Sequence, residues 1–146
     1  MTLIISAITT SKIGIWNIPM RGQNFINNYY ANMNNYKVGF VFSKGFLFKN
    51  YDILESIIKK NKKKKIIIIF CSALQLSTVK KNKKKFINFF KKYEMHFALE
   101  LKKGKGTKFF NQVFEELNFF TKQKNINIKN ITKYENLFKL YKKKII

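Results

Sequence analysis

The sequence predicts an α/β fold in three layers, with a four-stranded parallel or mostly parallel sheet covered by helices on both faces. Two observations lead to this prediction. Short apolar runs alternate with longer segments whose apolar residues recur at helical spacing, so residues 1–121 read as repeated strand–helix units. The strand runs are also nearly continuous in apolar residues, which is typical of parallel strands buried on both faces. A chain of 146 residues has the length of a single domain.

The predicted strands are short and are followed by polar residues. They span residues 3–8, 37–43, 65–71 and 95–100. The third contains four consecutive isoleucines and is predicted to be a central strand. Residues 102–106, which are lysines and glycines, are predicted to form a loop.

A helix is predicted after each strand. In the first helix, residues 21–35, one apolar stripe is expected to face the sheet; it consists of Phe25, Ile26, Tyr29, Tyr30 and Met33. Asn50 is the predicted N-cap of the second helix, residues 50–61, and Ser77 or Thr78 of the third. The fourth helix is indicated by Phe110, Val113, Phe114 and Leu117.

The C-terminal part of the chain is predicted to lie outside the α/β domain. Residues 122–131 are polar and read as a linker. In residues 132–146, Tyr134, Leu137, Phe138 and Tyr141 lie on one face of a basic amphipathic helix. We expect this helix to pack on the domain or on a second copy of the chain, and contact with an anionic membrane is the alternative.

The formal net charge of +23 has two readings. Of the 30 basic residues, only Arg21 is an arginine, and Lys, Asn, Ile and Phe are all abundant, as an AT-rich genome would encode. We therefore expect a mainly solvated lysine surface, with weak non-specific binding to nucleic acid; a real polyanion or anionic-lipid contact is the alternative. The single Cys71 permits no intramolecular disulfide, which fits a cytoplasmic protein.

Polar residues follow the predicted strands at the edge where α/β proteins bind ligands. They include Ser11 and Lys12 after the first strand, Ser72 and Gln75 after the third, and Glu100 at the end of the fourth. The functional interpretation makes this edge an active site with Glu100 as a base. The alternative is that each side chain only satisfies loop backbone groups or pairs with a lysine.

Common catalytic signatures are absent from the sequence. It contains no Walker A motif, no G-x-G-x-x-G and no G-x-S-x-G. One histidine and one cysteine cannot form a His/Cys metal cage, so no metal or other cofactor is expected. His96 is expected to be a core residue, with acid–base work as the alternative, and Cys71 a buried, unreactive thiol.

Five stretches occur in a fixed order within residues 3–101, namely TSK, IPMRGQNFINNYY, YDILE, CSALQL and EMHFALE. Together they resemble the sporadic carbohydrate cluster proteins, which are small proteins found in bacterial gene clusters for surface polysaccharide and lipopolysaccharide synthesis. Lys12 and Lys44 depart from the family pattern, which has an arginine and a glutamate there.

The resemblance implies a cytoplasmic enzyme or accessory subunit that acts on a sugar or nucleotide-sugar intermediate. We take Glu100, Ser11 and Ser72 as the candidate catalytic residues. The candidate substrate-binding residues are Lys12, Gln23, Asn24, Tyr30, Gln75 and His96. The resemblance also suggests other enzymes of the same cluster as partners, and the C-terminal helix suggests a second copy of the chain.

The predicted topology also resembles the catalytic domain of serine recombinases and, more broadly, flavodoxin-like folds. The alternative function is therefore a recombinase-like nucleic-acid-binding protein. Recombinase catalysis itself is not expected, because its arginine-rich site for phosphoryl transfer cannot be built with Arg21 alone.

Overall fold

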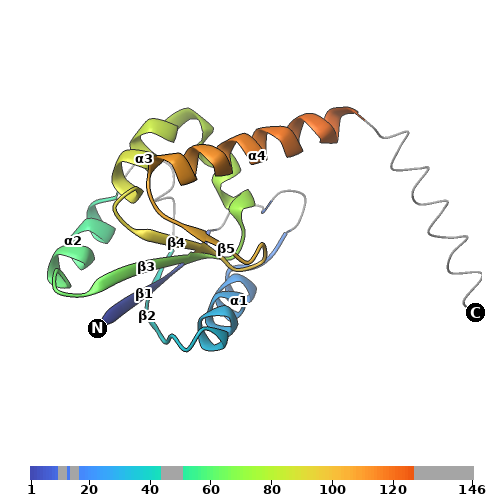
Figure 1. Ribbon diagram of the computed structural model, residues 1–146. Helices are drawn as coiled ribbons and strands as arrows, with labels where there is room; N and C mark the ends of the chain where they lie inside the picture. Colours follow the sequence, from blue (N-terminus) through green and yellow to red (C-terminus); the bar gives the residue numbers. More distant parts are fainter. Residues whose placement is uncertain (10–12, 14–16, 44–50, 127–146) are drawn as a thin grey trace, which may run out of the picture. The chain divides into compact units, whose positions relative to one another are not determined.

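The computed structural model describes residues 1–9, 13, 17–43 and 51–126. Its centre is a five-stranded sheet in the order β2-β1-β3-β4-β5. The strands are β1 (Thr2–Ala7), β2 (Val38–Phe42), β3 (Lys65–Phe70), β4 (Glu94–Phe97) and β5 (Lys102–Gly104). β1 to β4 are parallel, and β5 pairs with β4 in the antiparallel direction. The α/β class is confirmed, and the sheet is mostly parallel (Figure 1).

The prediction of four strands is wrong by one. β5 lies in the lysine- and glycine-rich segment that was predicted to be a loop. The predicted fourth strand is also shorter than expected, because residues after Phe97 form a turn in which Leu101 has a φ of 52°. This turn reverses the chain, and β5 then pairs with the outer edge of β4.

The four parallel strands end level with one another. Phe42 is the lateral neighbour of Ala7, Ala7 is the neighbour of Phe70, and Phe70 is the neighbour of Phe97. The residues that follow these strands therefore leave the sheet along one line. This register places the segments after β1, β3 and β4 close together in space.

Helices cover both faces of the sheet. Helix α1 (Met20–Met33) lies on one face, and α3 (Lys83–Phe90) with the start of α4 (Thr107–Ile126) lies on the other (Figure 1). On the second face, the aromatic rings of Phe86, Phe90 and Phe110 are fully buried and in contact. Tyr51, which precedes α2 (Asp52–Lys60), stacks on Phe89 with ring centroids 4.6 Å apart.

The predicted apolar stripe of α1 faces the sheet only in part, because Tyr30 is buried and Ile26 packs against the core, while the other three residues point away. Phe25, Tyr29 and Met33 are 72%, 62% and 64% exposed. The buried residues of α1 are Gln23, Asn27, Tyr30 and Ala31. The helix is turned this way because the sheet surface beneath it carries polar groups that α1 satisfies with hydrogen bonds, as described below.

The segment after β3 begins a helix earlier than predicted. A 3₁₀ helix, η1 (Ala73–Asn82), starts immediately after Ser72 and continues into α3. Ser72 is its N-cap, so the prediction of Ser77 or Thr78 as the cap is wrong. The predicted cap of the second helix, Asn50, lies outside the described residues.

The sheet and its covering helices form one compact unit, Met1–Phe114, somewhat shorter than the predicted domain of residues 1–121. Helix α4 continues past the end of this unit to Ile126, into the segment predicted as a linker. The predicted C-terminal helix, residues 132–146, lies outside the described residues. Among the described helices, none is long and apolar enough to cross a membrane.

Candidate functional site at the carboxyl edge of the sheet

The structure brings Ser72, Gln75 and Glu100 together beyond the level carboxyl ends of β1, β3 and β4. Ser72 follows β3, Gln75 lies in the first turn of η1, and Glu100 lies in the turn after β4. Thr9, which follows β1, joins this group. We call these four residues the carboxyl-edge cluster. Ser11 and Lys12 were predicted at the same edge and lie outside the described residues.

Glu100 binds the start of η1. The hydroxyl of Ser72 donates to Glu100 Oε1 at 2.5 Å, and the backbone N–H of Ala73 lies 3.2 Å from each carboxylate oxygen. A carboxylate is favourable there because the first N–H groups of a helix have no partner within the helix. The Glu100 side chain thus connects the turn after β4 to the segment after β3.

Ser72 and Gln75 form a capping box. The N–H of Leu74 donates to Ser72 Oγ at 3.1 Å, and the N–H of Ser72 donates to Gln75 Oε1 at 3.1 Å. This pairing satisfies two backbone donors that the helix itself leaves free. Both side chains are buried, with exposures of 1% and 2%. Their sequence signal is the Ser-x-x-Gln spacing directly after an apolar strand.

Gln23 of α1 forms hydrogen bonds with the segment after β1. Its Oε1 accepts from the N–H of Thr9 at 2.9 Å, and its Nε2 donates to the carbonyls of Thr9 at 2.8 Å and Ile18 at 2.9 Å. Gln75 Nε2 lies 3.4 Å from Thr9 Oγ1. One hydrogen-bonded path therefore runs from Glu100 through Ser72, Gln75 and Thr9 to Gln23.

Two more polar residues, which the sequence interpretation missed, complete the contact between α1 and the sheet. Asn27 Nδ2 donates to Ser6 Oγ at 2.9 Å and to the Ile69 carbonyl at 3.2 Å. Ser6 donates in turn to Asn24 Oδ1 at 3.0 Å. Ser6 and Asn27 are fully buried. A signal was present, because residues 23, 27 and 30 have helical spacing and are polar or amphipathic.

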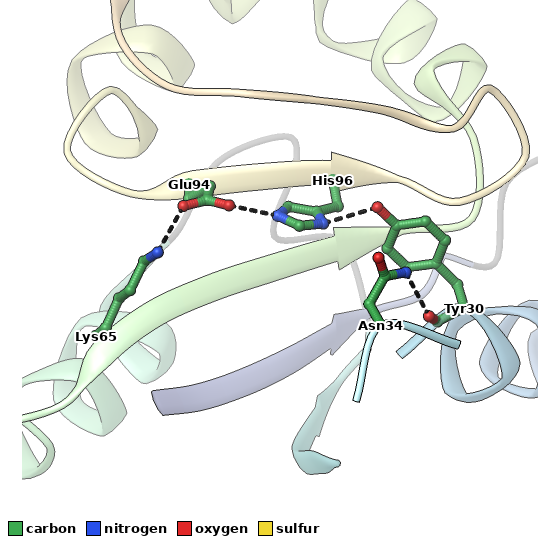
Figure 2. Close-up of polar contacts among 5 residues, drawn as sticks. All are labelled: Tyr30, Asn34, Lys65, Glu94 and His96. Atoms are coloured by element: carbon green, nitrogen blue, oxygen red, sulfur yellow. Dashed lines mark hydrogen bonds and ion pairs between the residues drawn. The ribbon is translucent and has the colours of Figure 1, made fainter. Parts of the chain in front are cut away.

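Tyr30 and His96 belong to a second, internal chain of contacts (Figure 2). The Tyr30 hydroxyl lies 2.8 Å from His96 Nδ1, and His96 Nε2 lies 2.7 Å from Glu94 Oε1. Glu94 Oε2 then pairs with Lys65 Nζ at 2.9 Å. Tyr30 and His96 are 8% and 1% exposed. The chain runs toward the amino ends of β3 and β4, where Lys65 and Glu94 begin their strands.

Several pKa values reflect these surroundings. The hydrogen bond from Lys65 lowers the pKa of Glu94, and the His96 bond acts in the same direction. Burial raises the pKa of Tyr30. Burial also raises the pKa of the Cys71 thiol to about 11, with a further contribution from the Glu100 charge. Cys71 is therefore protonated near neutral pH and is a poor nucleophile, since thiolates are the reactive form.

The carboxyl-edge cluster consists of one exposed carboxylate, two buried hydroxyls and one buried amide. Glu100 can accept a proton from a ligand or bind its hydroxyl groups, and the buried side chains hold the surrounding segments in place. Among the described residues, no group of three His, Cys, Asp or Glu side chains could hold a metal ion.

Comparison of the chain with models of protein families, with curated proteins and with solved structures finds no significant match. The likeness to the sporadic carbohydrate cluster proteins is therefore a hypothesis that rests on the quoted motifs.

Proposed function

We propose that the protein serves bacterial surface-carbohydrate biosynthesis, as a small enzyme or accessory subunit that binds a sugar or nucleotide-sugar intermediate at the carboxyl edge. The observation that carries the proposal is the junction of Glu100, Ser72, Gln75 and Thr9 beyond β1, β3 and β4. β1 and β3 are neighbours at the centre of the sheet, and α1 and the η1–α3 segment lead away from them. A parallel sheet binds ligands where its connections diverge in this way.

Within the proposal, the residues have different roles. Glu100 is the candidate base, since its carboxylate is exposed and Ser72 donates to it. Asn24 is partly exposed and is assigned to a ligand hydroxyl, and Ser11 with Lys12 is assigned to an anionic group. Gln23, Gln75, Tyr30 and His96 are buried, so we assign them to holding α1 and the loops in place.

The finer fold assignment is also part of the proposal. The order β2-β1-β3-β4-β5 with an antiparallel fifth strand fits a resolvase-like variant of the flavodoxin-like order. Shared architecture does not imply shared chemistry. A nucleic-acid-binding role remains the second candidate, and the net charge of +23 is the observation that favours it.

The proposal is tested by deleting the gene and comparing the lipopolysaccharide and polysaccharide profiles of the strains by gel electrophoresis. We expect an altered profile that the intact gene restores and the Glu100→Ala variant does not. Glu115→Ala, which removes an exposed carboxylate of α4, is the matched control and should restore the profile. An unchanged profile in the deletion strain contradicts the proposal.

Direct binding gives a second test. The purified chain is titrated calorimetrically with a panel of nucleotide sugars, and Glu100→Ala is compared with Glu115→Ala. Specific, saturable binding of one nucleotide sugar that only Glu100→Ala weakens supports the carboxyl-edge site. Sequence-specific binding of duplex DNA at physiological salt, with no binding of sugars, would favour the second candidate.

A further inference from the structure

A cavity lies at the edge of the sheet opposite the carboxyl-edge cluster, where the strands begin. It has a volume of about 500 Å³ and is formed by the ends of α2 and α3, the starts of β3 and β4, and the loop before α4. Six of its twelve lining residues are lysines, namely Lys59, Lys62, Lys64, Lys65, Lys92 and Lys105. We call this cavity the lysine pocket.

The number of lysines in the pocket exceeds what the composition of the chain provides. Half of the lining residues are lysines, whereas all basic residues together are 30 of 146 in the sequence. Four of them come from the lysine-rich run of residues 59–65, and Lys92 and Lys105 are added from two other segments of the chain. The fold gathers them around a concave surface.

Most of this positive charge has no carboxylate partner in the part of the chain that the structure describes. Glu55 pairs with Lys59 at 3.4 Å, and Glu94 pairs with Lys65 at 2.9 Å (Figure 2). Within residues 1–9, 13, 17–43 and 51–126, no carboxylate pairs with Lys62, Lys64, Lys92 or Lys105. Four ammonium groups therefore surround the cavity without a counter-charge from the described residues.

Helix dipoles do not balance this charge. α2 and α3 end at this edge, at Lys60 and Phe90. Each helix C-terminus is equivalent to about half a negative charge. The two helices together offset roughly one of the four free lysines. The remaining like charges repel one another within about one screening length, ~8 Å at physiological salt, and this repulsion is relieved when an anion binds.

The lining also indicates the kind of anion. Nine of the twelve lining residues have charged or amide side chains, and the other three are Ile58, Ile66 and Tyr93. The volume lies within the range of about 300–1,000 Å³ that is typical of small-molecule sites. Lysine ammonium groups bind phosphate as point charges.

We propose that the lysine pocket binds a small, multiply phosphorylated anion, such as a pyrophosphate or triphosphate group. This site is separate from the carboxyl-edge cluster and does not depend on the function proposed for it. A free polyphosphate and the diphosphate of a nucleotide share the chemistry that the pocket recognises.

The test is calorimetric titration of the full chain with inorganic pyrophosphate, tripolyphosphate, ADP and orthophosphate in about 0.15 M salt. The test variant is Lys62→Gln with Lys92→Gln. The matched control is Lys84→Gln with Lys103→Gln, which removes the same charge from exposed positions outside the pocket.

We expect tripolyphosphate and pyrophosphate to bind more tightly than orthophosphate. The test variant should weaken their binding about tenfold, as loss of two partly exposed charge pairs implies, and the control less than about twofold.

The ADP titration distinguishes the two sources of phosphate. If ADP and pyrophosphate bind with equal affinity, the pocket recognises the diphosphate alone. If ADP binds more tightly, the pocket recognises a nucleotide. Either result supports the site. Equal weakening in the two variant pairs would show diffuse attraction by the whole surface and overturn the proposal. The proposal would also be overturned if none of the phosphate compounds bound to the chain. It would be overturned as well if duplex DNA bound through the pocket lysines and pyrophosphate did not bind.

Discussion

At the scale of single residues, the side chains that hold α1 on the sheet are polar. Gln23 makes three hydrogen bonds to backbone groups of Thr9 and Ile18, and Asn27 bonds to Ser6 and to the end of β3. Buried polar groups cost free energy unless they are paired. These amides therefore stabilise the packing of α1 because they satisfy backbone groups that would otherwise be buried without partners.

Replacement of Gln23 should destabilise the protein far more than replacement of the larger Phe25. Gln23→Ala leaves the buried N–H and carbonyl of Thr9 and the partly buried carbonyl of Ile18 without this partner, and we expect a loss of about 2–4 kcal/mol in the free energy of unfolding. Phe25 is 72% exposed, so Phe25→Ala should change it by about 0.5 kcal/mol or less. Urea denaturation of both variants measures the change in the free energy of unfolding. A larger loss of stability in Phe25→Ala than in Gln23→Ala would contradict the observed orientation of α1.

The contacts of Glu94 should make stability depend on pH in the acid range. Its pKa is lowered in the folded protein, mainly by the hydrogen bond from Lys65. The stabilisation that the ionised Glu94 side chain gives to the fold is therefore fully present above the pKa of an unfolded glutamate, about 4.3. It is lost as pH falls through the lower pKa that Glu94 has in the folded protein. In Glu94→Gln, the free energy of unfolding should fall less steeply below about pH 5 than in the parent. The free energy of unfolding of both proteins is measured by denaturation at several pH values. An equally steep fall with pH in Glu94→Gln and in the parent would contradict the prediction.

At the scale of elements, the start of η1 connects two parts of the carboxyl edge. Ser72 caps the helix, and Glu100 binds both Ser72 and the N–H of Ala73. The Ser77 hydroxyl instead donates to the Leu74 carbonyl at 2.7 Å, inside the helix. The two serines thus make different contributions to the same element.

Loss of the Ser72 hydroxyl should therefore cost more stability than loss of the Ser77 hydroxyl. Ser72→Ala removes the acceptor for the N–H of Leu74, and a lost N-cap costs about 0.5–2 kcal/mol. Ser77→Ala removes no cap and should cost less. Thermal denaturation of the two single variants decides the comparison, and a greater loss in Ser77→Ala would show that the cap lies at the sequence-predicted position after all.

At the scale of the whole molecule, the α/β unit has ligand-binding candidates at both edges of its sheet. Polar residues gather beyond the carboxyl ends of the strands, and lysines, four of them without a carboxylate partner among the described residues, gather at the amino ends. The two sites differ in chemistry, since the first offers hydroxyl, amide and carboxylate groups and the second offers ammonium groups.

The C-terminal segment, which lies outside the described residues, provides a further prediction. The sequence predicts that Tyr134, Leu137, Phe138 and Tyr141 share one face of a helix, and burial of such a side chain contributes about 1.5–3 kcal/mol. Truncation after Ile126 should lower the melting temperature or change the oligomeric state. Calorimetry and analytical ultracentrifugation measure these. An unchanged melting temperature and mass, combined with lost binding to anionic vesicles, would assign the segment to a membrane surface instead.

The sequence by itself determined the α/β class, β1 to β3 and the carboxyl-edge residues Ser72, Gln75 and Glu100. These follow from local patterns, because continuous apolar runs indicate buried parallel strands and the residues after them must leave at one edge. The tertiary structure decided which face of α1 is buried, where η1 begins and that β5 exists. α1 carries both apolar and polar side chains, and the hydrogen bonds of Gln23 and Asn27 to backbone groups across the domain decide which of them are buried. β5 is formed by Lys-Lys-Gly, which has no strand signal of its own, and it pairs because β4 presents a free edge.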